Sequence, residues 1–205
     1  MHHRVLAWLF WRRKMRLLEQ RIISDGIVGE NDVLKVGTFL NQQIDTELMS
    51  RCADEFCRLY ADSGVTKILT VEASGIAIAA ITALKLGVQL VFAKKSVTSN
   101  VSGSVYAADA YSYTHNHNNT LIVPCAYLDK SDKVLIIDDF LARGEAVNAL
   151  ADICDRASAA IAGVGILIEK AYQGGGASIR KRGIRLESLA RIASLDIKNG
   201  IVFED

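Results

Sequence analysis

Two adjacent acids at the end of an apolar run are the clearest candidates for chemistry in this chain. The segment Val134–Ala146 reads V-L-I-I-D-D-F-L-A-R-G-E-A, with Asp138 and Asp139 following four apolar residues and Gly144 directly before a predicted helix. The N-terminus of a helix presents unpaired N–H groups and a partial positive charge, which favours a phosphate, and glycine lets the backbone approach that phosphate closely. Paired carboxylates can accept hydrogen bonds from adjacent sugar hydroxyls or support an associated Mg²⁺. The segment therefore indicates a site for a phosphorylated ribose.

Two common nucleotide-binding loops do not match this segment. No G-K-[ST] follows the glycine, so the loop is not a P-loop, and the dinucleotide fingerprint G-x-G-x-x-G is absent there. The remaining alternative is an exposed strand-to-helix turn in which an acid only caps the helix. Two acids directly after a buried strand, at the edge of a sheet where ligands bind, favour a binding site over that turn.

The elements that must position these residues alternate between helix and strand. Four segments are mostly continuous apolar runs, as expected for parallel strands buried on both faces, and helical patterns lie between them. The fold class is therefore α/β, an open and mainly parallel sheet flanked by helices, with ligands at the carboxyl ends of its strands. The predicted strands are Lys67–Glu72, Gln89–Ala93, Lys133–Asp138, Ala162–Glu169 and Arg185–Ala193, and the predicted helices are Met15–Ile23, Glu47–Asp62, Gly75–Leu86, Glu145–Ala157 and a basic helix after Gly174–Gly176. The polar segment Val97–Asn119 is predicted to form a long loop and a hairpin arm.

Length and charge indicate one soluble domain. The chain has 205 residues, half of them hydrophobic, and a formal net charge of +1, which gives no general reason to expect a nucleic-acid partner. Its four cysteines form no C-x-x-C pair, as expected for reduced thiols in the cytoplasm.

Residues 1–14 differ in charge from the rest of the chain. They carry four basic residues and no acid, and their apolar patch Val5–Trp11 is too short to cross a membrane. We expect these residues to be an N-terminal extension that is not part of the native chain, and residues 15–205 to form the domain.

The diacid segment resembles the 5-phosphoribosyl-1-pyrophosphate (PRPP) motif of type I phosphoribosyltransferases. Four further segments resemble the xanthine branch of that family: Val33–Asp45, Thr66–Ala77, Ile168–Gln173 and Leu186–Arg191. The resemblance implies the type I phosphoribosyltransferase fold, with a small hood from about residues 24–45 and the C-terminal segment. It also implies transfer of the phosphoribosyl group from PRPP to N9 of xanthine, giving XMP and pyrophosphate in purine salvage. Mg²⁺ carried by PRPP, a homodimer and a cytoplasmic location are implied as well.

The resemblance assigns roles position by position. It places Asp138 and Asp139 on the ribose hydroxyls as catalytic residues, with no direct protein ligand to the metal. The remaining roles are xanthine binding by Leu34, Asn41, Lys170 and Tyr172, binding of the 5′-phosphate of PRPP by Ala142, Arg143, Gly144, Glu145 and Ala146, and pyrophosphate binding by Glu72, Ala73, Ser74, Gly75, Lys94 and Lys95.

The chain departs from the family pattern in its phosphate loop. The loop more usually reads A-N-G-Q-A, whereas here it reads A-R-G-E-A. Glu145 puts a negative charge near a phosphate, and Arg143 restores the formal charge of the loop to zero. The segment after Lys95 is also less basic than in the family, which weakens the roles of Lys94 and Lys95.

Two other functions remain compatible with these residues. One is a preference for hypoxanthine or guanine, since few contacts separate the oxopurines. The other is a non-catalytic regulator that senses a purine or PRPP. Residues 1–14 are too few for a helix-turn-helix domain, which argues against a DNA-binding regulator.

Overall fold

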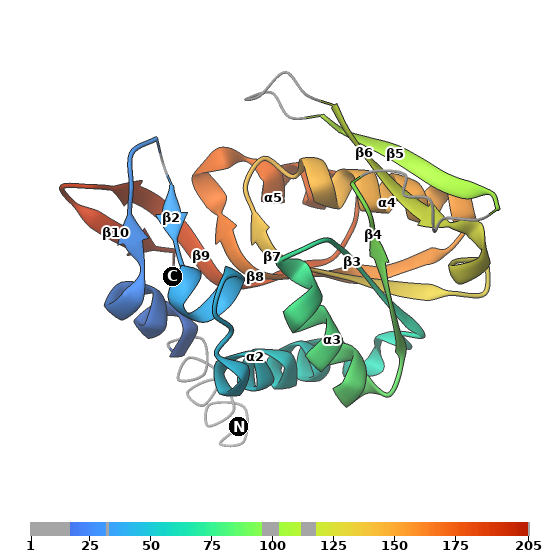
Figure 1. The fold of residues 1–205 in the computed structure, drawn as a ribbon, viewed down its shortest axis with the longest axis horizontal. Coiled ribbons are helices and arrows are strands. Elements are labelled where there is room, and N and C mark those ends of the chain that lie inside the picture. Colours follow the sequence, from blue (N-terminus) through green and yellow to red (C-terminus); the bar gives the residue numbers. More distant parts are fainter. Residues whose placement is uncertain (1–16, 32, 96–102, 112–117, 205) are drawn as a thin grey trace.

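A six-stranded sheet in the order β10-β9-β8-β7-β3-β4 forms the centre of the computed structural model (Figure 1). The structure describes residues 17–31, 33–95, 103–111 and 118–204. All neighbouring strands in this sheet are parallel except β10, which runs antiparallel to β9. The strands are β3 (Lys67–Val71), β4 (Gln89–Ala93), β7 (Lys133–Leu141), β8 (Ala160–Lys170), β9 (Leu186–Asp196) and β10 (Gly200–Phe203). The predicted open, mainly parallel α/β sheet is confirmed.

Helices cover both faces of this sheet and bury its apolar side chains (Figure 1). On one face, Phe56 of α2 and Ile78 of α3 pack with Ile137 of the sheet and with the helix over residues 17–25. On the other face, Leu150 of α4 packs against Ile136. The helices are α2 (Thr46–Leu59), α3 (Gly75–Leu86), α4 (Glu145–Ala157) and α5 (Gly175–Lys181). The continuous apolar pattern of the strands is thus explained by burial from two sides.

Helix ends follow local signals in the sequence. The Asp45 side chain accepts a hydrogen bond of 3.0 Å from the Leu48 N–H and caps α2, as predicted. Gly87 ends α3 in the left-handed conformation, with φ of +68°. The predicted helix Glu47–Asp62 is wrong at its end, because the chain tightens after Leu59 into the 3₁₀ turn η2 (Ala61–Ser63).

The region predicted as the hood lies beside β10, the edge strand of the sheet (Figure 1). It contains the two-residue strands β1 (Ile27–Val28) and β2 (Leu34–Lys35), which pair antiparallel, and the π-helix η1 (Gly37–Asn41). The antiparallel pair of β9 and β10 lies nearby (Figure 1). None of β1, β2, η1 and β10 was predicted as an element.

A hairpin arm is present as predicted, but its second strand runs to Pro124, beyond the predicted range Val97–Asn119. Strands β5 (Val105–Tyr111) and β6 (Asn118–Pro124) pair antiparallel and pack over α4 (Figure 1). The arm joins the sheet through a bridge in which the Lys94 and Ile122 backbones exchange two hydrogen bonds. Residues 96–102 and 112–117 of the predicted arm, and the predicted extension 1–14, lie outside the described residues.

Among the described residues, no helix has the length and apolar character needed to cross a bilayer. The four cysteines are free thiols, and burial raises the pKa of Cys52 and of Cys154 to about 12. Buried thiols of this kind are poor nucleophiles.

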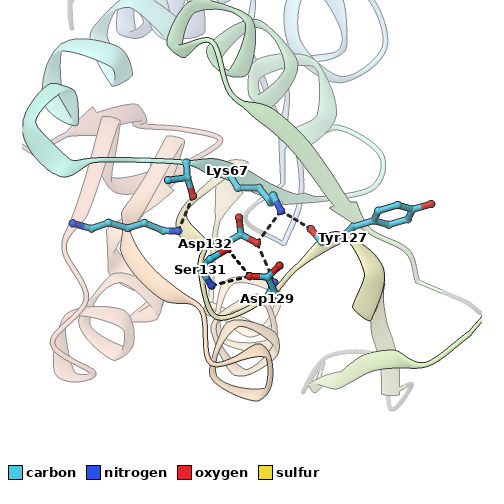
Figure 2. Close-up of polar contacts among 7 residues, drawn as sticks. Lys67, Tyr127, Asp129, Ser131 and Asp132 are labelled. Carbon is cyan, nitrogen blue, oxygen red and sulfur yellow. Dashed lines mark hydrogen bonds and ion pairs between the residues drawn. The ribbon is translucent and has the colours of Figure 1, made fainter.

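The amino ends of β3 and β7 carry a network of polar contacts, at the edge of the sheet opposite Asp138 (Figure 2). Lys67 Nζ donates to Asp132 Oδ2 and to the Tyr127 carbonyl oxygen, both at 2.8 Å. The Asp129 N–H also donates to Asp132 Oδ2, at 3.0 Å, and Ser131 donates to Asp129. Because Lys67 belongs to β3 and its two partners lie before β7, the network ties the loop before β7 to β3.

We expect Lys67→Met to lower the free energy of unfolding by about 2–3 kcal/mol, because it leaves the Asp132 carboxylate without its cation. The two side chains are 13% and 9% exposed, so water replaces the lost partner poorly. Lys85→Met is the matched control, since Lys85 and Asp54 form a more exposed pair, and its expected cost is about 1 kcal/mol or less. Urea unfolding of both variants tests this, and equal costs would contradict it.

Candidate active site

A cavity of about 630 Å³ lies at the carboxyl ends of the parallel strands. It brings together three of the predicted site segments, from the ends of β3, β4 and β7. The lining residues are Asn31, Val71, Glu72, Ser74, Lys95, Ala110, Leu121, Asp138, Asp139, Ala142, Arg143, Glu145, Ala146 and Gln173. These three segments therefore meet at the edge of the sheet where ligands of parallel sheets bind.

Both acids lie inside β7, which continues to Leu141, beyond the predicted end at Asp138. The strand continues to Leu141 because Phe140 pairs with Ile168 and Leu141 pairs with Glu169 on β8. Asp138 and Asp139 are only 4% and 6% exposed, yet both line the cavity. Burial, followed by the neighbouring Asp139 charge, raises the pKa of Asp138 well above its ordinary value. The strand thus holds two carboxyl groups rigidly, with little water around them.

The phosphate loop is short and built on backbone contacts. Gly144 has φ of +89°, which favours glycine, and α4 begins at the next residue. Its carbonyl oxygen accepts hydrogen bonds from the Asn148 N–H and from Asn148 Nδ2, at 2.9 and 3.0 Å. The Gly175 N–H donates to the Ala142 carbonyl oxygen at 3.1 Å, so α5 braces the loop from outside. The exposed Arg143 side chain reaches the cavity from this rigid turn.

The segment after β3 forms a second wall of the cavity. The Glu72 N–H donates to the Ala93 carbonyl oxygen, and Glu72 Oε1 accepts a hydrogen bond of 2.8 Å from the Lys95 N–H. The peptide bond between Glu72 and Ala73 is cis. Gly75 begins α3 directly beside the Asp138 carboxylate, where a Cβ would overlap Asp138 Oδ1. Of the two predicted lysines, Lys95 lines the cavity, and Lys94 is held in the bridge to Ile122 and is not among the lining residues.

The four predicted base contacts are not among the residues that line this cavity. Leu34 is 7% exposed and packs in the core, and Asn41 is exposed at the end of η1. Lys170 ends β8, and Tyr172 lies in the 3₁₀ turn η4 (Ala171–Gln173) at the same end of the sheet. Their roles stay predictions.

Five of the cavity residues were not predicted as site residues: Asn31, Val71, Ala110, Leu121 and Gln173. Gln173 follows Lys170 and Tyr172 in the same turn, and that adjacency was a usable signal. Asn31 lies in the β1–β2 turn with φ of +56°, and nothing in the sequence indicated that this turn reaches the cavity.

A family model described as "Phosphoribosyl transferase domain" matches residues 43–181, which include the acids, the loop and most of the other site segments. The chain belongs to the phosphoribosyltransferase family. The family predicted from the diacid segment is thereby confirmed. The family match begins after β1 and β2 and ends at the last residue of α5, so it includes strands β3 to β8.

Curated relatives within the phosphoribosyltransferase family cover nearly the whole chain. A protein of Ligilactobacillus salivarius named xanthine phosphoribosyltransferase is 51% identical over 190 residues, 93% of this chain and 98% of its own. A protein of Pseudomonas entomophila with the same name is 51% identical over 182 residues, 89% of this chain and 96% of its own. One of Bacillus cereus with that name is 47% identical over 189 residues, 92% of this chain and 95% of its own.

Solved structures confirm the phosphoribosyltransferase fold. The adenine phosphoribosyltransferase of Trypanosoma brucei, solved with AMP, pyrophosphate and ribose-5-phosphate, has a TM-score of 0.73, with 89% of this chain and 83% of that chain covered. That of Rhodothermus marinus has a TM-score of 0.70, with 88% of this chain and 99% of that chain covered. Sequence identities of 20% and 18% limit this likeness to the fold.

The residues present fit a metal that the substrate brings. Within the described ranges, no three His, Cys, Asp or Glu side chains are grouped as they would be in a protein-built metal site. Two adjacent carboxylates are an incomplete set of oxygen donors, which suits Mg²⁺ because that ion keeps several waters and binds substrate phosphates. Asp138 and Asp139 are the residues that would face such an ion, through water.

Proposed function

We propose that the protein transfers the 5-phosphoribosyl group from PRPP to N9 of xanthine, giving XMP and pyrophosphate. The observation that carries this proposal is the cavity that brings the diacid, the phosphate loop, Glu72 and Ser74 together at one edge of the sheet. The 51% identity to proteins named xanthine phosphoribosyltransferase supports xanthine as the base. The protein is thus an enzyme of purine salvage.

The proposed binding of PRPP follows from the cavity walls. The N–H groups at the start of α4 and in the Ala142–Ala146 loop hold the 5′-phosphate, aided by the positive end of the helix. Asp138 and Asp139 accept hydrogen bonds from the ribose hydroxyls. Backbone N–H groups of Ala73, Ser74 and Gly75, together with Lys95 and the nearby Lys94, face the pyrophosphate.

The base lies at the end of β8. In this proposal Lys170 donates to the 6-oxo group of the purine, and Tyr172 stacks on the ring. Asn41 binds the 2-oxo group that distinguishes xanthine from hypoxanthine, and Leu34 contacts the ring from the hood. Gln173, which follows Tyr172 and lines the cavity, would lie between the base and the ribose.

The reaction is proposed to begin at C1′ of the ribose. The bond between C1′ and the pyrophosphate oxygen breaks, its electron pair leaves with pyrophosphate, and the ribose gains oxocarbenium character. The N9 lone pair then forms the new bond to C1′, and the purine loses a proton to solvent. The buried carboxylates hold the ribose in line for this step, which is where positioning contributes most. Mg²⁺ bound to PRPP supplies positive charge for the departing pyrophosphate.

We further propose that the enzyme acts as a cytoplasmic homodimer and that residues 15–205 form its single domain. Its hood would comprise residues 24–45 and the C-terminal segment, and residues 1–14 would be an extension to it. The arm of β5 and β6, which contributes Ala110 and Leu121 to the cavity, would help to exclude water from the ribose cation.

A pyrophosphate-release assay with PRPP, Mg²⁺ and a panel of purines tests the proposed function. We expect kcat/KM to be highest for xanthine, lower for guanine and lowest for hypoxanthine. Equal values for hypoxanthine and xanthine would remove the role given to Asn41. If PRPP binds measurably but none of the purines leads to release of pyrophosphate, the result would favour the non-catalytic sensor instead.

A further inference from the structure

Glu169 is the most buried acidic side chain among the described residues, at 1% exposed. It lies at the end of β8, where it pairs with Leu141 on β7 and with Arg191 on β9, and it directly precedes Lys170. None of the roles proposed above involves it. A carboxylate buried this deeply is costly unless partners surround it, so its contacts indicate what it does.

Three side chains from two other elements hold the Glu169 carboxylate. Arg180 of α5 donates to both oxygens, from Nη1 to Oε1 at 3.2 Å and from Nη2 to Oε2 at 3.4 Å. Ser188 Oγ and Arg191 Nε of β9 donate to Oε2 at 2.6 and 3.2 Å. Arg191 Nη2 is also paired with Glu204, at 2.8 Å. The carboxylate therefore joins β8, β9, α5 and the C-terminal segment.

The first turn of α5 lies directly against this carboxylate. A Cβ at Gly176 would overlap Glu169 Oε1 and would come within 2.6 Å of Arg180 Nη1, so glycine is needed there. Burial alone would raise the pKa of Glu169, but the hydrogen bonds from Arg180 and Ser188 and the charges of Arg180 and Arg191 outweigh it and lower the pKa. The carboxylate is thus held charged in a site that excludes water.

The turn that follows Glu169 is a short connection between β8 and α5. The 3₁₀ turn η4 is three residues long, and the Gly174 N–H donates to the Ala171 carbonyl oxygen at 3.2 Å. Its two ends are the end of β8 and the start of α5, and the Glu169 carboxylate contacts both. Buried ion pairs add little net stability compared with apolar residues of similar size, so fixing a geometry is the better explanation of this cluster.

We propose that Glu169 is a positioning residue for the purine: held by Arg180, Ser188 and Arg191, it fixes the turn from Lys170 to Gln173 against the cavity. This inference rests on the proposed function, because that turn carries the base contacts Lys170 and Tyr172. Glu169 itself touches no substrate. It acts by fixing the direction in which Lys170 and Tyr172 present their side chains.

Glu169→Gln tests the proposal, because it keeps the shape of the side chain and removes its charge. We expect the KM for xanthine to rise about tenfold, since small displacements of positioning groups have effects of this size or larger, while the KM for PRPP changes less than about twofold. In a Lys170→Ala background the same substitution is expected to change the KM for xanthine by less than about twofold, because residues that act through one another are not additive. A merely structural role would not produce this dependence on Lys170.

Glu55→Gln is the matched control. Glu55 is also nearly fully buried and is also held by an arginine, Arg58, but it lies on α2 and does not line the cavity. We expect it to lower the melting temperature without changing either KM. If Glu169→Gln does not fold, Ser188→Ala, which removes one hydrogen bond, is expected to raise the KM for xanthine in the same selective way.

Two results would overturn the positioning role: an unchanged KM for xanthine in a folded Glu169 or Ser188 variant, or an equal effect with and without Lys170. Assaying the wild-type protein in parallel distinguishes failure of the positioning role from failure of the proposed function. If the wild type rejects xanthine, the proposed function fails, and the positioning role is then measured with the purine that does react.

Discussion

Replacing Asp138 or Asp139 with asparagine is expected to lower kcat/KM for PRPP by about a hundredfold or more. An amide keeps the shape of the carboxyl group, but it cannot supply negative charge next to a ribose that becomes cationic. Both side chains are nearly buried, so no water can take over this role at the same place. Steady-state pyrophosphate release at varied PRPP, with saturating xanthine, measures the loss.

The Asp138→Asn variant is also expected to be at least as stable as the wild type near neutral pH. Because the folded-state pKa of Asp138 is raised above its ordinary value of 3.8, the folded protein binds this proton more tightly than the unfolded chain. The stability that results is fully present below the ordinary pKa and is lost as the pH rises through the raised pKa. Asparagine stays neutral, so in urea titrations the variant should lose less stability than the wild type as the pH is raised above the ordinary pKa of 3.8.

Asp132→Asn is the matched control for the Asp138→Asn and Asp139→Asn variants. Asp132 is likewise buried and lies before the same strand, but it belongs to the network with Lys67 at the opposite edge of the sheet (Figure 2). We expect this variant to be less stable than the wild type and to keep its kcat/KM. Wild-type kcat/KM in both Asp138→Asn and Asp139→Asn would mean that the catalytic site is elsewhere.

The parts of the fold that were predictable from sequence are those with local signals. Helix α3, strand β4 and helix α4 have the predicted bounds, because Gly87 and Gly144 mark turns and the apolar runs between such turns are long. The end of β7 was misplaced, since its last residues are strand only through pairing with β8. The polar residues Asp138 and Asp139 suggested that the strand ends there, and the sequence carries no local signal that pairing with β8 continues it.

The parts of the site that could not be predicted depend on contacts between distant residues. Strands β1 and β2 have two residues each, too short to show a period, so the position of Asn31 at the cavity was not visible. The partners of Glu169 lie 11 to 22 residues further along the chain, on different elements. In the sequence Glu169 is only the acid before Lys170, and its near-complete burial emerges when α5 and β9 pack against β8.

The contact between α5 and the phosphate loop is the second place where a large effect is expected. Gly175→Ala should raise the KM for PRPP by about tenfold or more and lower the free energy of unfolding by about 1–3 kcal/mol. A Cβ at Gly175 would overlap the Ala142 carbonyl oxygen and would lie 2.8 Å from both the Arg143 carbonyl carbon and the Gly144 nitrogen. These are backbone atoms that no rotamer change can move. The loop must therefore shift, and its N–H groups lose their alignment on the 5′-phosphate.

Gly87→Ala separates this displacement from a general loss of stability. Gly87 has φ of +68° and no heavy atom within 4 Å of the added Cβ, so alanine there should cost about 1 kcal/mol through backbone strain alone. Both variants are then expected to lose stability in urea titrations, but only Gly175→Ala should show a raised KM for PRPP. A normal KM for PRPP in Gly175→Ala would mean that the loop binds the phosphate without support from α5. Because the bracing contact is made by backbone atoms, the side chains of the loop can differ from the usual A-N-G-Q-A while its geometry is kept.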